Sequence, residues 1–199
     1  MFIADPEAAF EDVLVALAQS RSGVLEKYTR FAAPTVCWSP AVEAVPIPAL
    51  RNGLARWHAL RGDRQIPDWH DFRSEEFGMI VSRSSVVDPI PGTTDLRYRI
   101  FGSRIAESVG RDWEGATIGD IARAEHRLGP VMIRAVYILA HERKVPVYTR
   151  HSRARGRYVD EWHRIVLPFR TPESSGIRFL AAAEVVERDA NVGHQAIHN

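Results

Sequence analysis

Residues 95–115 read DLRYRIFGSRIAESVGRDWEG, and the fold is decided in this stretch. Leu96, Tyr98 and Ile100 alternate with two arginines, which is the period of a strand that has one buried face. After Ile100 the alternation stops. The pattern therefore predicts a strand that ends at a sharp corner, with Tyr98 and Ile100 facing the same side.

A short helix is predicted directly after this strand. Gly102 breaks the alternation, and the hydroxyl of Ser103 can cap the first turn of a helix. Ile105 and Val109 are four residues apart, so one side of the helix is apolar and can lie on the sheet. Gly110 can take the left-handed conformation that ends a helix. A strand, a corner and a helix in this order enclose a hollow.

These residues resemble a known family. The run YRIFGSRI at 98–105, the GRD at 110–112 and Gly115 are similar to bacterial PAS-like domains, which carry a YR-apolar-x-G-T/S corner and then a GRD-x-x-G loop. The resemblance covers roughly residues 50–188 and has two departures, Ser103 in place of Thr and Trp113 in place of a small polar residue. It implies an α+β fold, with a five-stranded antiparallel sheet that carries helices on one face.

The chain is expected to have three parts. These are an N-terminal helix and proline-rich linker over 1–49, the PAS-like domain over 50–188, and a flexible tail over 189–199. Within the domain we predict helices over 50–61, 71–77, 117–121 and 128–141, and strands over 79–87, 96–100, 145–153, 157–169 and 177–186.

The first part combines an amphipathic helix with a linker. Asp5-Pro6 is a typical helix start, and the apolar residues that follow recur at helical spacing. We interpret this helix as packing on its own domain. The alternative is that it forms the contact of a homodimer, which helices flanking PAS-like domains often do. Residues 32–49 contain four prolines, which favour an extended segment lying along a surface.

The totals exclude several classes of protein. A net charge of +1 is too small for a general attraction to nucleic acid or to a lipid surface. The single cysteine, Cys37, excludes an internal disulfide and a cysteine metal cluster. No apolar run approaches the roughly 20 residues of a membrane span, and no secretory signal is recognisable. We expect a cytoplasmic protein that binds neither nucleic acid nor membrane.

The hollow is the best candidate for a binding site. We predict that its walls are formed by the strand, the corner, the short helix and its loop, the long helix and the facing strand. The wall residues are Tyr98, Ile100, Arg104, Ile105, Val109, Trp113, Met132, Val136, Tyr137, Trp162 and Ile165. Which face of strand 158–168 points inward stays open, because both faces carry apolar residues. Apolar walls with one arginine would suit a small organic or aromatic acid. Alternatively, the aromatic side chains simply fill the core.

Histidines could carry other chemistry. His163 lies on the same side of its strand as Glu161, an arrangement that suits acid–base catalysis but is more typical of a cross-strand pair on the surface. His126 or His141 could hold haem, as a helix histidine does in some PAS domains. Histidines at helix ends usually have an electrostatic role, so we expect no haem and no metal site.

A dense basic cluster lies near the predicted turn between two strands. It consists of Arg150, His151, Arg153, Arg155 and Arg157. Nucleic-acid binding would require interleaved aromatic residues and a broader positive surface. We therefore interpret the cluster as the solvated tip of a hairpin.

Three functions follow from these observations. The first is a non-catalytic sensory or signalling module that binds a small ligand, a protein partner or both, as a homodimer. Because the sequence ends soon after the last predicted strand, we expect its output to act through another protein. The second is a small enzyme that uses the same hollow, with His163 and Glu161 or Arg104 and Tyr98 as reacting groups. The third is a protein–protein adaptor with a filled core.

Overall fold

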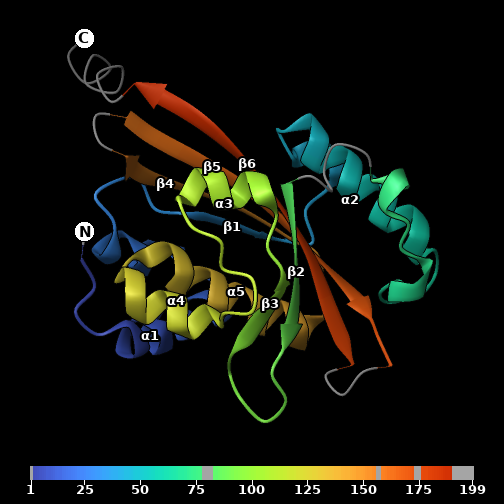
Figure 1. Cartoon of the computed structure of the whole chain (residues 1–199), viewed down its shortest axis with the longest axis horizontal. Helices are drawn as coiled ribbons and strands as arrows, with labels where there is room; N and C mark the ends of the chain where they lie inside the picture. Colours follow the sequence, from blue (N-terminus) through green and yellow to red (C-terminus); the bar gives the residue numbers. More distant parts are fainter. Residues whose placement is uncertain (1, 78–82, 156–157, 173–175, 190–199) are drawn as a thin grey trace.

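The computed structural model describes residues 2–77, 83–155, 158–172 and 176–189 of the chain (Figure 1). The α-helices are α1 (Pro6–Ala18), α2 (Pro48–Arg61), α3 (Ser103–Val109), α4 (Ile118–Glu125) and α5 (Leu128–Arg143). The strands are β1 (Thr35–Trp38), β2 (Ser84–Pro89), β3 (Leu96–Ile100), β4 (Val147–Arg155), β5 (Tyr158–Arg170) and β6 (Ile177–Asp189). Short 3-10 segments are η1 (Ser22–Tyr28), η2 (Val42–Ala44), η3 (Trp69–Asp71) and η4 (Ser74–Glu76). Within these ranges no helix is both long and apolar enough to cross a membrane.

One antiparallel sheet forms the centre of the molecule. Its strand order is β1-β4-β5-β6-β2-β3, and every neighbouring pair is antiparallel. The longest pairing joins β5 to β6, from Tyr158 opposite Asp189 to Arg170 opposite Ile177. The predicted α+β class with an antiparallel sheet is confirmed. The expected number of strands is wrong, because the sheet has six strands instead of five.

The additional strand, β1, comes from the segment predicted to be a linker. Val36 pairs with Thr149 and Cys37 with Tyr148, so β1 extends the sheet beyond β4. Pro34 and Pro40 lie outside this four-residue strand and leave its pairing intact. Proline is tolerated at such positions on an edge strand. The linker prediction is therefore wrong for β1.

Helical segments cover both faces of the sheet, whereas they were expected on one. The Tyr137 ring of α5 lies 5.1 Å from Phe179, and the Trp69 ring of η3 lies 5.4 Å from Phe169. Phe169 pairs with Arg178, the residue next to Phe179, so the two contacts are on opposite faces. Figure 1 shows α2 across β5 and β6 from α4 and α5. The physical reason is that both faces of the long strands are apolar and need cover.

Helix α1 packs against its own domain, as interpreted from its apolar face. Asp5 caps the helix by accepting hydrogen bonds from the backbone N–H groups of Glu7 and Ala8, both at 3.1 Å. Phe10 is buried, and the guanidinium carbon of Arg134 on α5 lies 4.0 Å above the centre of its ring. The apolar face of α1 is thus covered within the chain.

The corner between β3 and α3 differs from the prediction in two residues. Gly102 occupies the N-cap position and has no side chain that could cap the helix. Ser103 is the first helical residue and not the cap. The register between β2 and β3 shifts at Val86, which pairs with Ile100 while its neighbour Val87 pairs with Tyr98. The extra residue on β3 is a β-bulge, and it turns Ile100 to the face opposite Tyr98. Ile100 is 50% exposed.

The segment predicted as a helix over 71–77 forms η3 and η4 instead. Each contains only three residues. The rings of Trp69 and Phe72 stack at 4.9 Å, and Phe72 also lies 4.9 Å from Phe77. Packing of these aromatic rings over the sheet determines the path of the chain here. The predicted strand over 79–87 is found as β2, and its first residues lie outside the described ranges, as does the predicted tail after Asp189.

Candidate functional site

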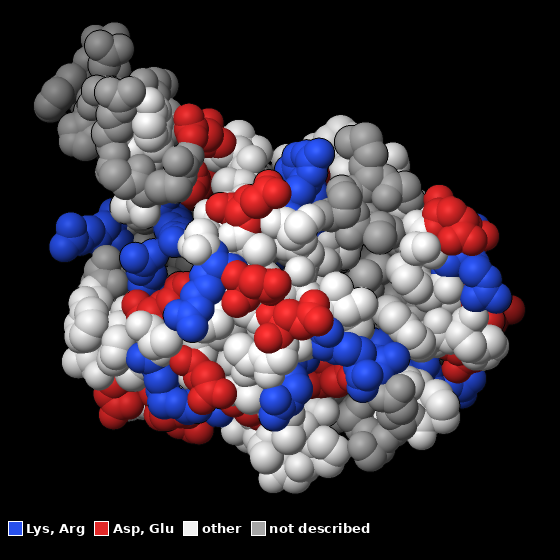
Figure 2. Space-filling view, viewed as in Figure 1, with Lys and Arg blue, Asp and Glu red and all other residues white. Residues whose placement is uncertain are grey.

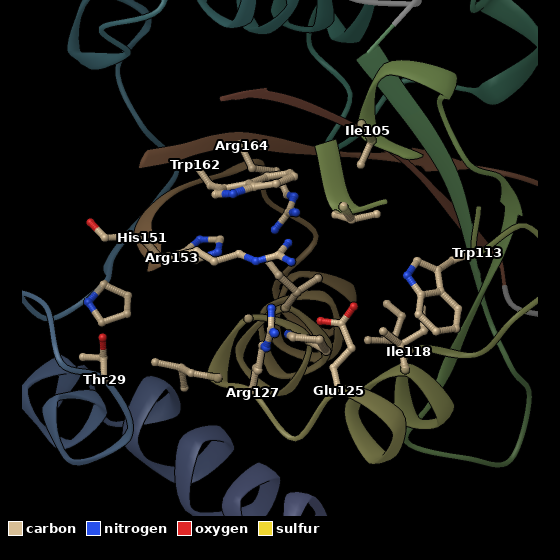
Figure 3. Close-up of a pocket in the computed structure, with 18 of the residues that line it drawn as sticks. Thr29, Ile105, Trp113, Ile118, Glu125, Arg127, His151, Arg153, Trp162 and Arg164 are labelled. Atoms are coloured by element: carbon tan, nitrogen blue, oxygen red, sulfur yellow. The ribbon is translucent and has the colours of Figure 1, made fainter. Parts of the chain in front are cut away.

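A cavity of about 290 Å³ lies between the sheet and the helices over it. Its walls come from strands β2 to β6, from α3, α4 and α5, and from residues 28–34, which connect η1 to β1 (Figure 3). The helix α3, placed by the corner after β3, forms one wall. The hollow predicted from that corner is therefore present.

Six of the eleven predicted site residues line this cavity. They are Tyr98, Ile105, Val109, Trp113, Tyr137 and Trp162. On β5, Trp162 and Arg164 line the cavity, whereas Ile165 lies on the other face. The inward face of this strand is therefore the one that carries Trp162 and Arg164.

The other five predicted residues lie elsewhere. Ile100 is turned away by the bulge, Arg104 is on the exposed side of α3, and Ile165 is on the opposite face of β5. Met132 and Val136 are fully buried, but Ile133 and Tyr137 are the α5 residues that face the cavity. One residue corresponds to about 100° around a helix, so a shift of one position changes the wall to which a side chain belongs.

Polar residues of the cavity were missed by the sequence prediction. His151 and Arg153 of β4, Arg164 of β5, and Glu125 and Arg127 around the end of α4 all line it. Once Trp162 is placed inward, the period of a strand places Arg164 inward as well. The other residues could not be found this way, because their position depends on the β4–β5 register and on the end of α4.

Three buried polar atoms of the cavity have no hydrogen-bond partner in the part of the chain that the structure describes. They are Nη1 of Arg164, Nε1 of Trp162 and Nδ1 of His151. Trp162 is only 3% exposed, and the Arg164 guanidinium carbon lies 5.9 Å from the centre of its ring. Buried donors are normally paired, so unpaired donors beside a cavity indicate a site for an acceptor.

Burial and nearby charges shift the pKa values of three residues of the site, His151, Tyr98 and Tyr137. Burial, and then the charges of Arg164 and Arg153, lower the pKa of His151 to about 3. Burial raises the pKa of the Tyr98 hydroxyl, the charge of Arg164 lowers it by less, and the charge of Glu125 adds to the increase. Burial also raises the pKa of Tyr137 well above its ordinary value. At neutral pH His151 is therefore uncharged and both tyrosines are protonated.

The pair of His163 and Glu161 lies on the other face of the sheet. Nε2 of His163 is 2.9 Å from Oε1 of Glu161, and Nδ1 is 2.7 Å from the hydroxyl of Tyr148. His163 is 5% exposed and Glu161 8%, so the prediction of a surface pair is wrong. His163 and Glu161 alternate with Trp162 and Arg164 along β5, and this pair therefore cannot act on a molecule in the cavity.

The two histidines considered for haem do not line the cavity. Nδ1 of His126 lies 2.8 Å from the carbonyl oxygen of Ile3, and its ring stacks on Phe2. His141 belongs to the last turn of α5. Among the described residues there is no group of three His, Cys, Asp or Glu side chains that could hold a metal ion.

The basic cluster is only partly a solvated hairpin tip. His151 and Arg153 line the cavity, because they lie on the same face of the sheet as Trp162. Arg157 lies outside the described residues. On the face drawn in Figure 2, basic and acidic side chains are interspersed. That face lacks the broad positive surface that nucleic-acid binding requires.

Comparison with known families agrees with this geometry. Residues 46–183 match the model of the PAS domain family. The chain matches no curated protein and no solved structure. The matched range contains β2 to β5, the first part of β6 and α3 to α5, and it excludes α1, β1 and residues 28–34. Because the match spans more than half of the sequence and includes the corner that forms the hollow, the chain belongs to the PAS domain family.

Proposed function

We propose that this protein is a sensory module that binds a small molecule in the cavity and passes the signal to another protein without catalysing a reaction. PAS domains are generally sensory or signalling modules. The observation that carries the proposal is the cavity itself, about 290 Å³ between the sheet and the helices over it. This volume is close to the lower end of the range of about 300–1,000 Å³ for ligand pockets.

The arrangement supports a sensor more than the two alternatives. An adaptor with a filled core would not need an open cavity beneath α3. An enzyme would need a base and its orienting partner within reach of a bound substrate. The one buried histidine–carboxylate pair described above, His163 with Glu161, is on the opposite face of the sheet.

The N-terminal part offers a route for the signal. Tyr28 lines the cavity, and its hydroxyl donates a hydrogen bond of 2.7 Å to Asp12 on α1. Lys27 pairs with the same carboxylate at 2.6 Å. A ligand that contacts Tyr28 would therefore affect a segment bound to α1. The homodimer stays a prediction, and its contact would use surfaces other than the apolar face of α1.

Native mass spectrometry of the purified protein tests this function. Val109→Trp places a large ring in the cavity from α3, while Glu107→Trp places the same ring on the exposed side of the same helix. We expect an additional mass on the wild type and on Glu107→Trp, and its loss from Val109→Trp. A small molecule that Val109→Trp retains in full would show that binding occurs elsewhere, and the proposal would fail.

A further inference from the structure

The cavity has an excess of positive charge. Four arginines line it, Arg30, Arg127, Arg153 and Arg164, against a single carboxylate among the described lining residues, Glu125. Figure 3 shows Arg153 and Arg164 extending from the sheet into the cavity. A cavity of this composition attracts anions, because charges inside it are poorly screened by water.

Arg164 is the arginine best placed to bind an anion. It is partly buried on the central strand β5, and it forms no ion pair with a described carboxylate. Its Nη1 and the Nε1 of Trp162, two residues earlier on the same face, are both buried donors without a described partner. Burying an unpaired guanidinium costs free energy. Two buried donors on one face of β5, neither with a described acceptor, suit a ligand that brings an acceptor with negative charge.

One end of the cavity is apolar. In Figure 3, Ile105, Trp113 and Ile118 stand at the end of the cavity away from His151. A volume of about 290 Å³ corresponds to roughly ten water molecules, at about 30 Å³ each. A cavity of this size has room for a ligand with one ring or a branched chain together with one small polar group.

The geometry points to an organic acid as the ligand, with its carboxylate bound by the Arg164 guanidinium and the Trp162 indole N–H and its apolar body against the walls below α3. This inference rests on the proposed function and names its ligand class. A carboxylate accepts the parallel N–H groups of a guanidinium in a bidentate arrangement. A phosphate would also suit arginine, but the apolar side chains of Ile105, Trp113 and Ile118 favour an acid that carries an apolar body.

Matched pairs of probes test the inference by calorimetric titration of the full chain at pH 7. The acids are benzoate, phenylacetate and 3-phenylpropionate, and each is compared with its uncharged amide of nearly equal size. Inorganic phosphate is the third probe. We expect the best acid to bind about ten- to a hundredfold more tightly than its amide, since a hydrogen bond to a charged group contributes that much. Phosphate should bind more weakly than the best acid, because it has no apolar body to place against the walls.

Two arginine variants locate the effect. Arg164→Gln should remove most of the difference between acid and amide, because it weakens binding of the acid far more than binding of the amide. Arg104→Gln is the matched control, because Arg104 is exposed on α3 and does not line the cavity. Without ligand, Arg164→Gln should unfold at the same temperature as the wild type or at a higher one. A purely structural arginine would instead lower the unfolding temperature when replaced.

Each result decides between the two proposals. Amides that bind as tightly as the acids, or an acid preference that survives in Arg164→Gln, would overturn the inference and leave the sensor function standing. Phosphate that binds more tightly than every acid would overturn the carboxylate assignment. If no acid or amide binds and the purified protein retains no small molecule, the proposed function and the inference both fail.

Discussion

At the scale of single residues, the surroundings of His151 in the cavity lower the pKa of its imidazole. It lies beside Arg153 and Arg164, and burial together with these two charges keeps its pKa at about 3. An unfolded chain has no such environment, so there the imidazole takes up a proton near pH 6.5. As the pH falls from about 6.5 toward 3, the unfolded state binds a proton that the folded state does not. Acid therefore favours unfolding through this residue.

We expect the wild type to lose about 1–2 kcal/mol more stability than His151→Gln between pH 7 and pH 5. Urea denaturation at the two pH values measures this difference. His70→Gln is the control, because the His70 side chain is 79% exposed and does not line the cavity. Equal losses for the wild type and His151→Gln would show that His151 titrates normally in the folded protein.

Single residues also show how far the sequence could predict the site. The glycine at the corner was recognised as a break in the strand, but the reason for it is long-range. A Cβ on Gly102 would overlap the carbonyl oxygen of Ser84 on β2. Ile100 was placed in the hollow by its period, and a β-bulge reversed it. A bulge depends on the neighbouring strand, so the local pattern around Ile100 does not contain it.

At the scale of elements, Arg134 ties α1 to the body of the domain. It is 6% exposed on α5, its Nη1 lies 2.7 Å from a carboxylate oxygen of Glu7 on α1, and its Nε donates to the carbonyl oxygen of Thr94 at 3.0 Å. Arg123 pairs with the other carboxylate oxygen of Glu7 at the same distance, 2.7 Å. The Arg123 side chain, however, is 51% exposed.

The two arginines should therefore differ in their contribution to stability. We expect Arg134→Gln to lower the free energy of unfolding by about 2–3 kcal/mol, because it loses charge-assisted hydrogen bonds in a buried setting. Arg123→Gln should cost less than about 1 kcal/mol, as is typical of an exposed ion pair. Chemical denaturation of both variants measures the difference. Equal losses would mean that burial adds nothing to the pair between Arg134 and Glu7.

The bounds of the helices and strands were predicted better than the side of each that faces the cavity. Helical periodicity identified α5 nearly to its ends, yet it selected Met132 and Val136 for the cavity in place of Ile133. Since α5 is buried on most of its circumference, its apolar pattern does not distinguish the wall of the cavity from the core. The strand β1 was missed for a different reason, because prolines close to both of its ends suggested a linker.

At the scale of the whole molecule, the N-terminal part is built into the domain although the PAS family match begins at residue 46. It contributes a strand to the sheet through β1, a wall of the cavity through residues 28–34, and a helix packed on α5 through α1. The expected division at residue 49 separates segments that share one core. Cores that are shared in this way usually unfold cooperatively.

Hydrogen exchange of the full chain can test whether α1 belongs to that cooperative unit. Val13 and Leu17 of α1 are buried in the same core cluster as Val136 of α5. Opening α1 alone would expose the apolar surface of both helices and remove Glu7 from Arg134. We therefore expect amides in the middle of α1 to require an opening free energy similar to those of α5, and to lose protection in parallel with them as urea is added. Exchange of α1 at the rate of an unfolded peptide, with α5 still protected, would instead identify the N-terminal part as a separable extension.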